Sequence, residues 1–460
     1  MNGILSSSAK TSWTDWLGTL RVELSQRSGL RADSCELFGP DLAPDQIFLL
    51  LAGVSLTPLV YLEYTSLEQQ RVWLIAGGGR ISRKGCACAD RSSPPDSHFL
   101  AFLPFPGATT DCEVKCDPWQ ARAQPCRLYP QFIFQGSVTD GSTRFLYLRP
   151  PALSPDSSSL LALLDLFEEA ASASQAMASS TLDMNLVSLV PSQQQWFRYL
   201  QTIQQAIAKD ELQKVIAARF SQYSLSDPVQ AHLAFLRLRS QTPTANHYFV
   251  SLDQDSCWFG ASPEILYQRS GSHIMTQAVA GTRPFQNHHE RDRQAYFDLL
   301  HQDKEHREHA IVVRAIEEKL IQLGVTLEEQ NLRHVIRIGN LLHLCQYIHG
   351  HLPPDFDEKN LCRALHPTPA IGGYPQDKAI AFITRHEPFY RGYYGGLICL
   401  HTPDHTLSVV TIRTLLFRGD SLYTFVGAGI TAESDPSREW EELQTKELAL
   451  LSWNRESGRE

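Results

Sequence analysis

Short apolar runs between turn residues dominate the first part of the chain. The runs at 72–76, 132–134 and 145–148 have the length and the flanking turn residues of β-strands. A longer apolar stretch at 47–62 is interrupted by glycine, serine and proline, and it is shorter than the roughly 20 residues of a bilayer span. We interpret it as two buried strands and predict a strand-rich part up to about residue 190.

Helical periodicity appears just after residue 190. Ser192 and Gln195 form a capping box, and apolar residues then recur every three or four positions, which predicts a helix to about Lys209. Further helices are expected at 290–324 and 436–452. Further strands are expected at 274–279, 397–400, 407–412 and 422–426. This mixture predicts an α+β layered fold.

The segment 212–220 alternates as a strand and places Lys214 on the same face as Ile216 and Ala218. A lysine on an otherwise apolar face has two interpretations. Either it extends its charged end to water at the sheet edge, or burial lowers its pKa and makes it a candidate general base.

The composition is that of a globular protein, with 43% hydrophobic and 20% charged residues. The formal net charge of −9 argues against nucleic acid as the main partner, because phosphate binding draws on clustered Lys and Arg. The first 16 residues lack the apolar core and the cleavage site of a secretory signal. We therefore expect a cytoplasmic protein with neither nucleic acid nor membrane as partner.

Half of the ten cysteines lie in one segment of the N-terminal part. They are Cys86, Cys88, Cys112, Cys116 and Cys126. A zinc or iron–sulfur site is one interpretation, although the repeated C-x-x-C pair of such sites is missing from the sequence. The other is that they are small buried apolar residues.

Two pairs of glutamates have helical spacing on different predicted helices. Glu305 and Glu308 project from one face of the first helix. Glu439 and Glu442 project in the same way from the second. Such a pair alone is usually a solvated helix face. If the two pairs meet in space, they form a set of hard oxygen donors that suits Mg²⁺.

A glycine-rich segment precedes the last predicted helix. From Gly427 through Ala428 to Gly429 we expect a loop between strand and helix, whose backbone amides can receive an anion. Lys446 follows Glu442 by four residues. It either forms an exposed ion pair with that glutamate or binds a carboxylate of a ligand.

Glu264 and Arg413 stand beside strand ends. Glu264 follows Gly-Ala-Ser-Pro in a turn between two strands, where a partly desolvated carboxyl can stay protonated and serve as an acid. An ordinary turn residue is the alternative. Arg413 follows the strand at 407–412 and either holds a carboxylate through two hydrogen bonds or is a residue of the rim.

Together these segments resemble the chorismate-utilising enzymes, a family that includes anthranilate synthase component I, aminodeoxychorismate synthase, isochorismate synthase and salicylate synthase. The resemblance covers 195–452 and rests on motifs that follow one another in the family's order. They are LQKVIAARF (212–220), FGASPEIL (259–266), AVAGTRP (278–284), DKEHREH (303–309), LHPTPAIGG (365–373), RGYYGG (391–396), TIRT (411–414) and GAGITAESDPSREWEE (427–442).

The resemblance implies an α+β fold of the anthranilate synthase component I type. This is an α/β sandwich of two stacked antiparallel sheets flanked by helices, with the active site in the cleft between them. Residues 1–190 would be a strand-rich part of the same fold. Residues 191–455 would be the chorismate-binding catalytic region.

The resemblance also implies the ligands of the site. Glu308 and Glu442 would coordinate Mg²⁺, with Glu305 and Glu439 in or near the coordination shell, and the ion would neutralise the ring carboxylate of chorismate. Tyr394 and Arg413 would contact the pyruvyl carboxylate. The full set of implied substrate contacts is Gly281, Thr282, His343, Ala370, Tyr394, Arg413, Gly427, Ala428, Gly429 and Lys446.

Three positions distinguish the members of this family. Aminodeoxychorismate synthases carry a nucleophilic lysine where this chain has Ala280. Anthranilate synthases usually have glutamine at the position of Lys214, because ammonia needs no base whereas water does. Members that eliminate pyruvate tend to have threonine at the position of Ala370. The resemblance therefore implies an isochorismate synthase, with salicylate synthase as the alternative.

In the implied reaction, Lys214 removes a proton from the water that adds at ring carbon 2, and Glu264 protonates the hydroxyl that leaves carbon 4. We expect neither a redox cofactor nor an obligate glutaminase subunit, and a monomer or weak homodimer. The product could feed menaquinone, siderophore or salicylate synthesis. A noncatalytic chorismate- or metal-binding protein is a further alternative, but such a copy would be expected to have lost one of these residues.

Overall fold

The computed structural model describes residues 13–26, 34–40, 42–54, 56–83, 98–106, 115–120, 122–138, 141–148, 163, 165–168, 182–226, 231–329, 332–354 and 356–454. The chain forms two compact units. The first comprises Met1–Arg80, Tyr129–Ser179 and Phe249–Gln254, and the second comprises Ile81–Leu128, Ser180–Tyr248 and Asp255–Glu460. Three strands contain a boundary between the units, namely β4 (Arg80–Ser82), β6 (Cys126–Tyr129) and β11 (Asn246–Ser251).

The first unit contains an antiparallel sheet with the strand order β1-β8-β7-β3-β2. Its elements are α1 (Trp13–Gln26), β1 (Ser34–Phe38), α2 (Pro44–Gly53), β2 (Leu59–Thr65), β3 (Arg71–Gly77), β7 (Phe132–Ser137) and β8 (Thr143–Leu148). Trp13 and Trp16 of α1 pack against Phe134 of β7, with ring centroids 5.9 and 5.5 Å from that phenylalanine. Buried aromatic rings therefore join α1 to this sheet.

The stretch at 47–62 is only half as predicted, because its first part is the helix α2 and only its second part is a strand. Pro44 begins the helix, where a missing N–H costs nothing. Gln46 accepts a hydrogen bond from the backbone of Ala43 at 2.9 Å. Ile47 and Leu51 lie four residues apart and are buried on one side. A capped start and one apolar face thus favour a helix over a strand.

The second unit contains two antiparallel sheets. The first has the order β12-β21-β22-β10-β18, with β9 also paired to β10. Its strands are β9 (Met184–Val190), β10 (Lys214–Leu225), β12 (Ser256–Ser262), β18 (Gly373–Tyr374), β21 (Thr414–Arg418) and β22 (Ser421–Ile430). The long pair of β10 and β22 places Ile216 opposite Gly429. This pair forms one wall of the site described below.

The second sheet of this unit has the order β15-β17-β14-β13-β20-β19-β5-β6, with β16 also paired to β17. Its strands besides β6 are β5 (Phe99–Leu103), β13 (Ile265–Ser270), β14 (His273–Pro284), β15 (Thr326–Leu327), β16 (His334–Ile338), β17 (Leu341–His351), β19 (Leu397–His401) and β20 (His405–Val410). Phe102 of this sheet meets Trp258 of the other edge to face, with centroids 6.2 Å apart. The two sheets are therefore stacked.

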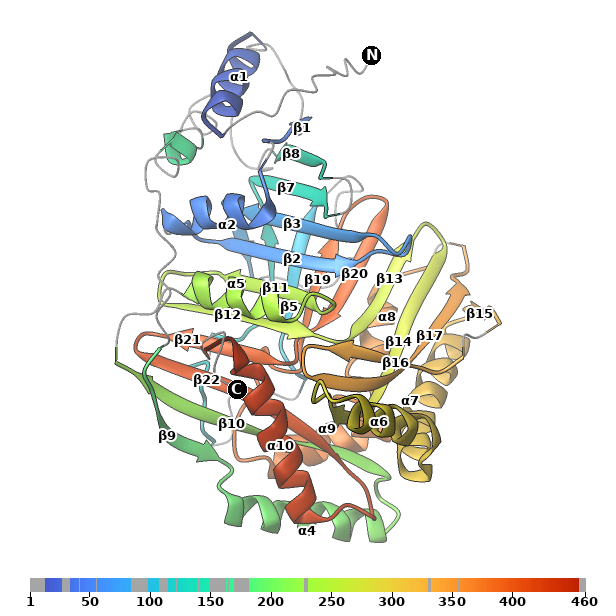
Figure 1. The fold of residues 1–460 in the computed structure, drawn as a ribbon. Coiled ribbons are helices and arrows are strands. Elements are labelled where there is room, and N and C mark those ends of the chain that lie inside the picture. Colours follow the sequence, from blue (N-terminus) through green and yellow to red (C-terminus); the bar gives the residue numbers. More distant parts are fainter. Residues whose placement is uncertain are drawn as a thin grey trace. The chain divides into compact units, whose positions relative to one another are not determined.

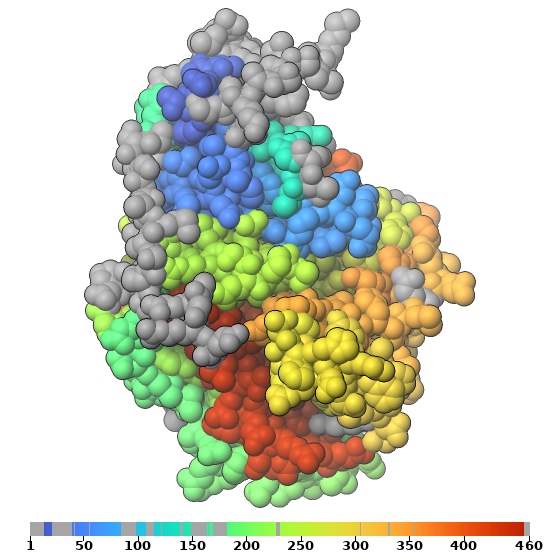
Figure 2. Space-filling model, in the orientation of Figure 1, coloured from blue at the N-terminus to red at the C-terminus, as the bar shows by residue number. Residues whose placement is uncertain are grey.

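Helices flank the two sheets of this unit (Figure 1). They are α4 (Gln193–Ala208), α5 (Ala231–Gln241), α6 (His289–His301), α7 (Asp303–Gln322), α8 (Lys359–Leu365), α9 (Gln376–His386), α10 (Pro436–Leu450) and the short 3₁₀ helix η1 (Ser452–Asn454). Helices α4 and α10 pack on β10 and β22, and α6 and α7 pack on β14. Figure 2 shows α10 in red and α6 in yellow, each exposing one side on the surface of this unit. The predicted α+β sandwich of stacked antiparallel sheets is confirmed.

One of two predicted helices is confirmed, and the other is divided into two. The helix after residue 190 begins and ends as expected, with Gln195 and Ser192 capping it and Lys209 at its C-cap. The segment 290–324 is not one helix but α6 and α7, because Gln302 between them has an extended backbone, with ψ 133°. Among the described residues, no helix is long and apolar enough to cross a membrane.

The predicted cysteine cluster lies partly outside the described residues, which leave out Cys86, Cys88 and Cys112. Cys116 is exposed, and Cys126 is buried with its sulfur 3.7 Å from the hydroxyl of Tyr393. Burial raises the pKa of the Cys126 thiol. In the part of the chain that the structure describes, Cys126 therefore fits the interpretation as a small buried residue.

Candidate active site

A pocket lies between the two sheets of the second unit. It contains about 920 Å³ of space not filled by protein atoms, part of which is open solvent. Strands β10 and β22 supply one wall, β14 and β17 supply another, and α7 and α10 contribute side chains. The predicted site residues that line it are Lys214, Glu264, Gly281, Thr282, Glu305, Glu308, His343, Ala370, Tyr394, Arg413, Gly427, Gly429, Glu439, Glu442 and Lys446.

Lys214 is buried at the start of β10 and points into this pocket. Its Nζ donates a hydrogen bond to Oε1 of Glu308 at 2.8 Å. Ile216 lines the same pocket, which agrees with the predicted strand face. The interpretation that Lys214 extends to water at a sheet edge is therefore wrong, because its side chain is held inside the protein by a carboxylate.

Glu264 lies in the turn between β12 and β13, as predicted, and it is only 1% exposed. Burial raises the pKa of its carboxyl to about 8, although a hydrogen bond from Thr368 and the charge of Lys214 act in the opposite direction. The Thr368 hydroxyl donates to Oε1 at 3.0 Å. Glu264 is therefore mostly protonated at neutral pH and able to donate a proton into the pocket.

The two glutamate pairs do meet at this pocket, Glu305 and Glu308 from α7 and Glu439 and Glu442 from α10. Basic side chains contact Glu305, Glu308 and Glu442. Arg283 Nη2 lies 2.7 Å from Glu305 Oε1, and Lys446 Nζ lies 2.6 Å from Glu442 Oε1. Lys214 holds Glu308, as described above. These contacts hold the three carboxylates at the pocket.

The predicted anion-binding loop at 427–430 is wrong, because these residues are the end of strand β22. Their glycines instead make room for the site. A Cβ at Gly429 would come within 2.7 Å of Glu308 Oε1 and 2.9 Å of Lys214 Cε. Ala428 does not line the pocket, since neighbouring residues of a strand face opposite sides. Its predicted substrate contact is therefore not supported by its position.

Lys446 forms the ion pair that its spacing predicted, but it does so within the pocket. It forms the ion pair with Glu442, and it also donates a hydrogen bond to the carbonyl oxygen of Gly427 at 2.8 Å. Its side chain is only 11% exposed and lines the pocket. The contact is therefore part of the site and not an exposed surface pair.

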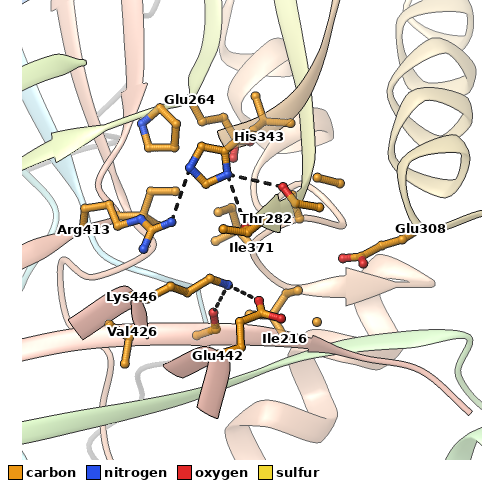
Figure 3. A pocket seen from close by; sticks show the side chains of 18 of the residues that line it. Ile216, Glu264, Thr282, Glu308, His343, Ile371, Arg413, Val426, Glu442 and Lys446 are labelled. Carbon is orange, nitrogen blue, oxygen red and sulfur yellow. Dashed lines mark hydrogen bonds and ion pairs between the residues drawn. The ribbon is translucent and has the colours of Figure 1, made fainter. Parts of the chain in front are cut away.

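His343 joins three of the pocket residues (Figure 3). Its Nδ1 donates to the carbonyl oxygen of Gly281 at 3.3 Å and lies 3.2 Å from the hydroxyl of Thr282. Its Nε2 accepts from Arg413 Nη2 at 3.5 Å. Burial and the charge of Arg413 hold the pKa of His343 well below its ordinary value, so the ring is neutral. It positions the arginine without adding a second charge.

Arg413 lies between β20 and β21 in a left-handed backbone conformation, with φ 57°. Burial lowers the pKa of its guanidinium to about 10. Its Nη1 is buried and has no hydrogen-bond partner among the described residues. Tyr394 lines the pocket with it and stacks on Phe425 at 5.4 Å. A buried guanidinium with a vacant donor is prepared to bind an anion.

Ala280 and Ala370 both line the pocket with small side chains. Ala280 lies on β14, and Ala370 follows α8 next to Ile371. Arg391 fixes this part of the wall, because its Nη1 donates to the carbonyl oxygen of Ile371 at 2.9 Å. The same guanidinium forms a buried ion pair with Glu387 at 2.6 Å.

The sequence did not indicate Arg391, Arg283 or Thr368 as individual site residues. All three lie within the quoted motifs RGYYGG, AVAGTRP and LHPTPAIGG. Arg283 and Arg391 line the pocket, and Thr368 reaches it through Glu264. The motifs marked the segments that contain these three residues. The groups that the residues contact lie on other segments, so spacing along the sequence could not assign their individual roles.

Comparison with known proteins agrees with this geometry. The family of chorismate binding enzymes matches residues 155–453. Isochorismate synthase MenF of Pasteurella multocida is 29% identical over 330 residues, which cover 70% of this chain and 74% of that protein.

Two solved structures share the fold. MenF, the menaquinone-specific isochorismate synthase from Escherichia coli, matches with a TM-score of 0.78 at 23% identity, over 96% of this chain and 99% of that one. Anthranilate synthase component I from Streptococcus pneumoniae matches with a TM-score of 0.63 at 16% identity, over 92% and 93%. Because the family match spans well over half of the sequence, the chain belongs to the family of chorismate-binding enzymes.

Proposed function

We propose that this chain is an isochorismate synthase, an isomerase that converts chorismate into isochorismate. The observation that carries the proposal is that a buried lysine and a protonated glutamic acid face one pocket, the lysine from a strand and the acid from the turn that joins the two sheets. Lys214 comes from β10 and Glu264 from the turn before β13. A base and an acid on two walls of one cleft suit a reaction that adds water at one ring carbon and removes a hydroxyl at another. The similarity to MenF of Pasteurella multocida supports the same activity.

Chorismate carries two carboxylates, and each of them needs a positively charged group in the pocket. Arg413, with its vacant Nη1, and the neighbouring Tyr394 would bind the pyruvyl carboxylate. Lys446 also lines the pocket, where it pairs with Glu442. The ring carboxylate would lie on the side of the four glutamates, where it needs an additional cation.

The donor set of the four glutamates fits Mg²⁺, which prefers carboxylate oxygens. Glu308 and Glu442 would hold the ion, with Glu305 and Glu439 beside them. When bound, the ion supplies the positive charge that offsets the ring carboxylate. Basic partners hold Glu305, Glu308 and Glu442 at the pocket, and carboxylates bind metal in their ionised form.

Residues of the chain itself then carry out the proton transfers. The neutral amine form of Lys214 accepts a proton from water at Nζ while the water oxygen bonds to ring carbon 2. The ring double bonds shift, and the bond from carbon 4 to its hydroxyl breaks. Glu264 gives its proton to that hydroxyl, which leaves as water. The atoms balance to an isomerisation without a redox step, and the acid Glu264 is almost completely buried.

Chromatographic analysis of the products of purified protein with chorismate and Mg²⁺ tests the proposal. We expect isochorismate from the chain alone, with neither ammonia nor a second subunit added. Lys214→Ala is the matched control, because it removes the base at a position where the backbone pairs with Tyr374 of β18. Salicylate and pyruvate in equal amounts would identify a salicylate synthase instead, and unchanged chorismate would refute the proposed activity.

A further inference from the structure

A cluster of three histidines and one glutamate lies at one edge of the second sheet of the second unit. His273 begins β14 and stands directly opposite His351 of β17. His349 lies two residues before His351, so both point to the same face of β17. Glu328 follows β15, and its backbone N–H donates to the carbonyl oxygen of His349 at 3.0 Å. Figure 1 shows β15 and β17 at this edge of the sheet.

The side-chain atoms of this cluster have the spacing of metal ligands. His349 Nδ1 lies 3.4 Å from His273 Nε2, and that nitrogen lies 3.6 Å from Glu328 Oε1. One ligand atom from each of these three residues lies within 4.8 Å of the other two. Tetrahedral ligands at about 2.0–2.2 Å from an ion lie about 3.3–3.6 Å apart. The cluster therefore needs little rearrangement to surround an ion.

The chemistry of the cluster differs from that of the active-site pocket. Two imidazoles and one carboxylate suit zinc and neighbouring transition metals, whereas a set of carboxylates suits magnesium. The residues that line the pocket, as the structure describes them, include no member of the cluster.

We propose that His273, Glu328 and His349 form a binding site for a divalent transition-metal ion, with zinc as the preferred ion. His351 positions the carboxylate, because its Nε2 lies 3.1 Å from Glu328 Oε1. Three protein ligands leave a fourth position for water. The ion links β14, β15 and β17, three strands that the chain reaches at positions far apart in sequence. A bound ion that the unfolded chain holds less well stabilises this sheet edge.

Titration of metal-free full-length protein with Zn²⁺ tests the site. A chromophoric chelator competes for the zinc, and excess Mg²⁺ is present throughout. We expect about one tightly bound zinc per chain, a visible spectrum of histidine-ligated Co²⁺ after cobalt substitution, and a higher unfolding temperature with zinc. His273→Ala combined with His349→Ala should abolish all three. His405→Ala, which changes an exposed histidine of the same sheet, should retain them.

Two further variants separate this site from the carboxylate pocket. Glu308→Gln should retain the tight zinc, and its loss there would place the ion in the pocket and overturn the proposal. His351→Ala should weaken zinc binding by ~10–100-fold, as expected for a residue that orients a ligand. Should the double histidine variant fail to fold, Glu328→Gln serves instead, since it changes an exposed side chain and keeps its shape. Undiminished zinc in a folded variant of the proposed ligands would equally refute the site.

Discussion

The hydroxyl of Thr368 donates a hydrogen bond to Oε1 of Glu264 at 3.0 Å. The two residues are 104 positions apart in sequence, and both are almost completely buried. This bond stabilises the ionised carboxylate and so limits how far burial raises the pKa of Glu264. It therefore tunes the acid of the proposed reaction to a pKa of about 8.

The pH dependence of catalysis should follow Glu264. The rate requires the protonated form of Glu264 and should fall as the pH rises through about 8.

The stability of the protein should also depend on this group. Because folding raises the pKa of Glu264 from 4.5, the folded state binds this proton more tightly than the unfolded state. The resulting stabilisation is fully present below the unfolded pKa of 4.5 and is lost as the pH rises to about 8. Glu264→Gln should lower the rate by ~10²–10⁴-fold and flatten the stability profile in this window; wild-type turnover in this variant would exclude Glu264 as the acid.

Thr368→Val removes the hydrogen bond and nearly keeps the volume. The pKa of Glu264 should rise, so the alkaline limb of the rate profile should shift to higher pH while the protein stays folded. Thr384→Val is the control, because its hydroxyl donates to Ile380 within α9 and not to Glu264. A profile unchanged in Thr368→Val would show that this contact does not set the acid's pKa.

The proposed metal requirement has a direct test. EDTA should abolish turnover, and Mg²⁺ should restore it. Glu308→Gln should raise the Mg²⁺ concentration needed for half-maximal activity by at least ~10-fold. Loss of a residue that only supports a metal ligand already weakens metal binding by at least ~10-fold. Glu441→Gln, an exposed neighbour of Glu442 on α10, should behave as wild type. The ligand assignment fails if Glu308→Gln keeps both full activity and the original Mg²⁺ requirement.

Gly429 should not tolerate a side chain, because neighbouring groups leave no space for one. Its backbone conformation is not the reason. A Cβ there would collide with Glu308 and Lys214. Gly429→Ala should therefore displace both groups and reduce turnover by about 10²-fold, as misplacement by an ångström can do. Ala428→Gly, at the adjacent position outside the pocket, should keep turnover and lose only about 0.5–1 kcal/mol of unfolding free energy. Equal losses of turnover in the two variants would contradict this explanation.

Ala370 is proposed to keep the product at isochorismate. Ala370→Thr should increase the fraction of pyruvate and salicylate, because a hydroxyl beside the ring changes how the substrate is held. One such group contributes only ~1–3 kcal/mol of discrimination, so a mixture is expected rather than complete conversion. Lactate dehydrogenase coupled to pyruvate and the fluorescence of salicylate measure the two products. An unchanged product ratio would show that other residues control the second step.

Local sequence determined those helices and strands whose caps and apolar periodicity can be seen in the sequence itself. The helix α4 has its capping box and an apolar face that repeats every three to four residues. The glutamate pairs had to share a helix face, because residues three apart on a helix are neighbours. The motif order was enough to indicate the family, and Lys214 could be placed on the correct strand face from alternation alone.

Tertiary structure decided what lies against each of these faces. An apolar run at 47–53 became the helix α2, because a cap and one buried side outweighed the strand interpretation. The glycines at 427 and 429 became part of β22, because pairing with β10 extends the strand beyond the apolar run. Lys214 meets Glu308, 94 positions away, only when the sheets stack. Periodicity records which side of a segment is buried, whereas the partner on that side is chosen by packing between segments distant in sequence.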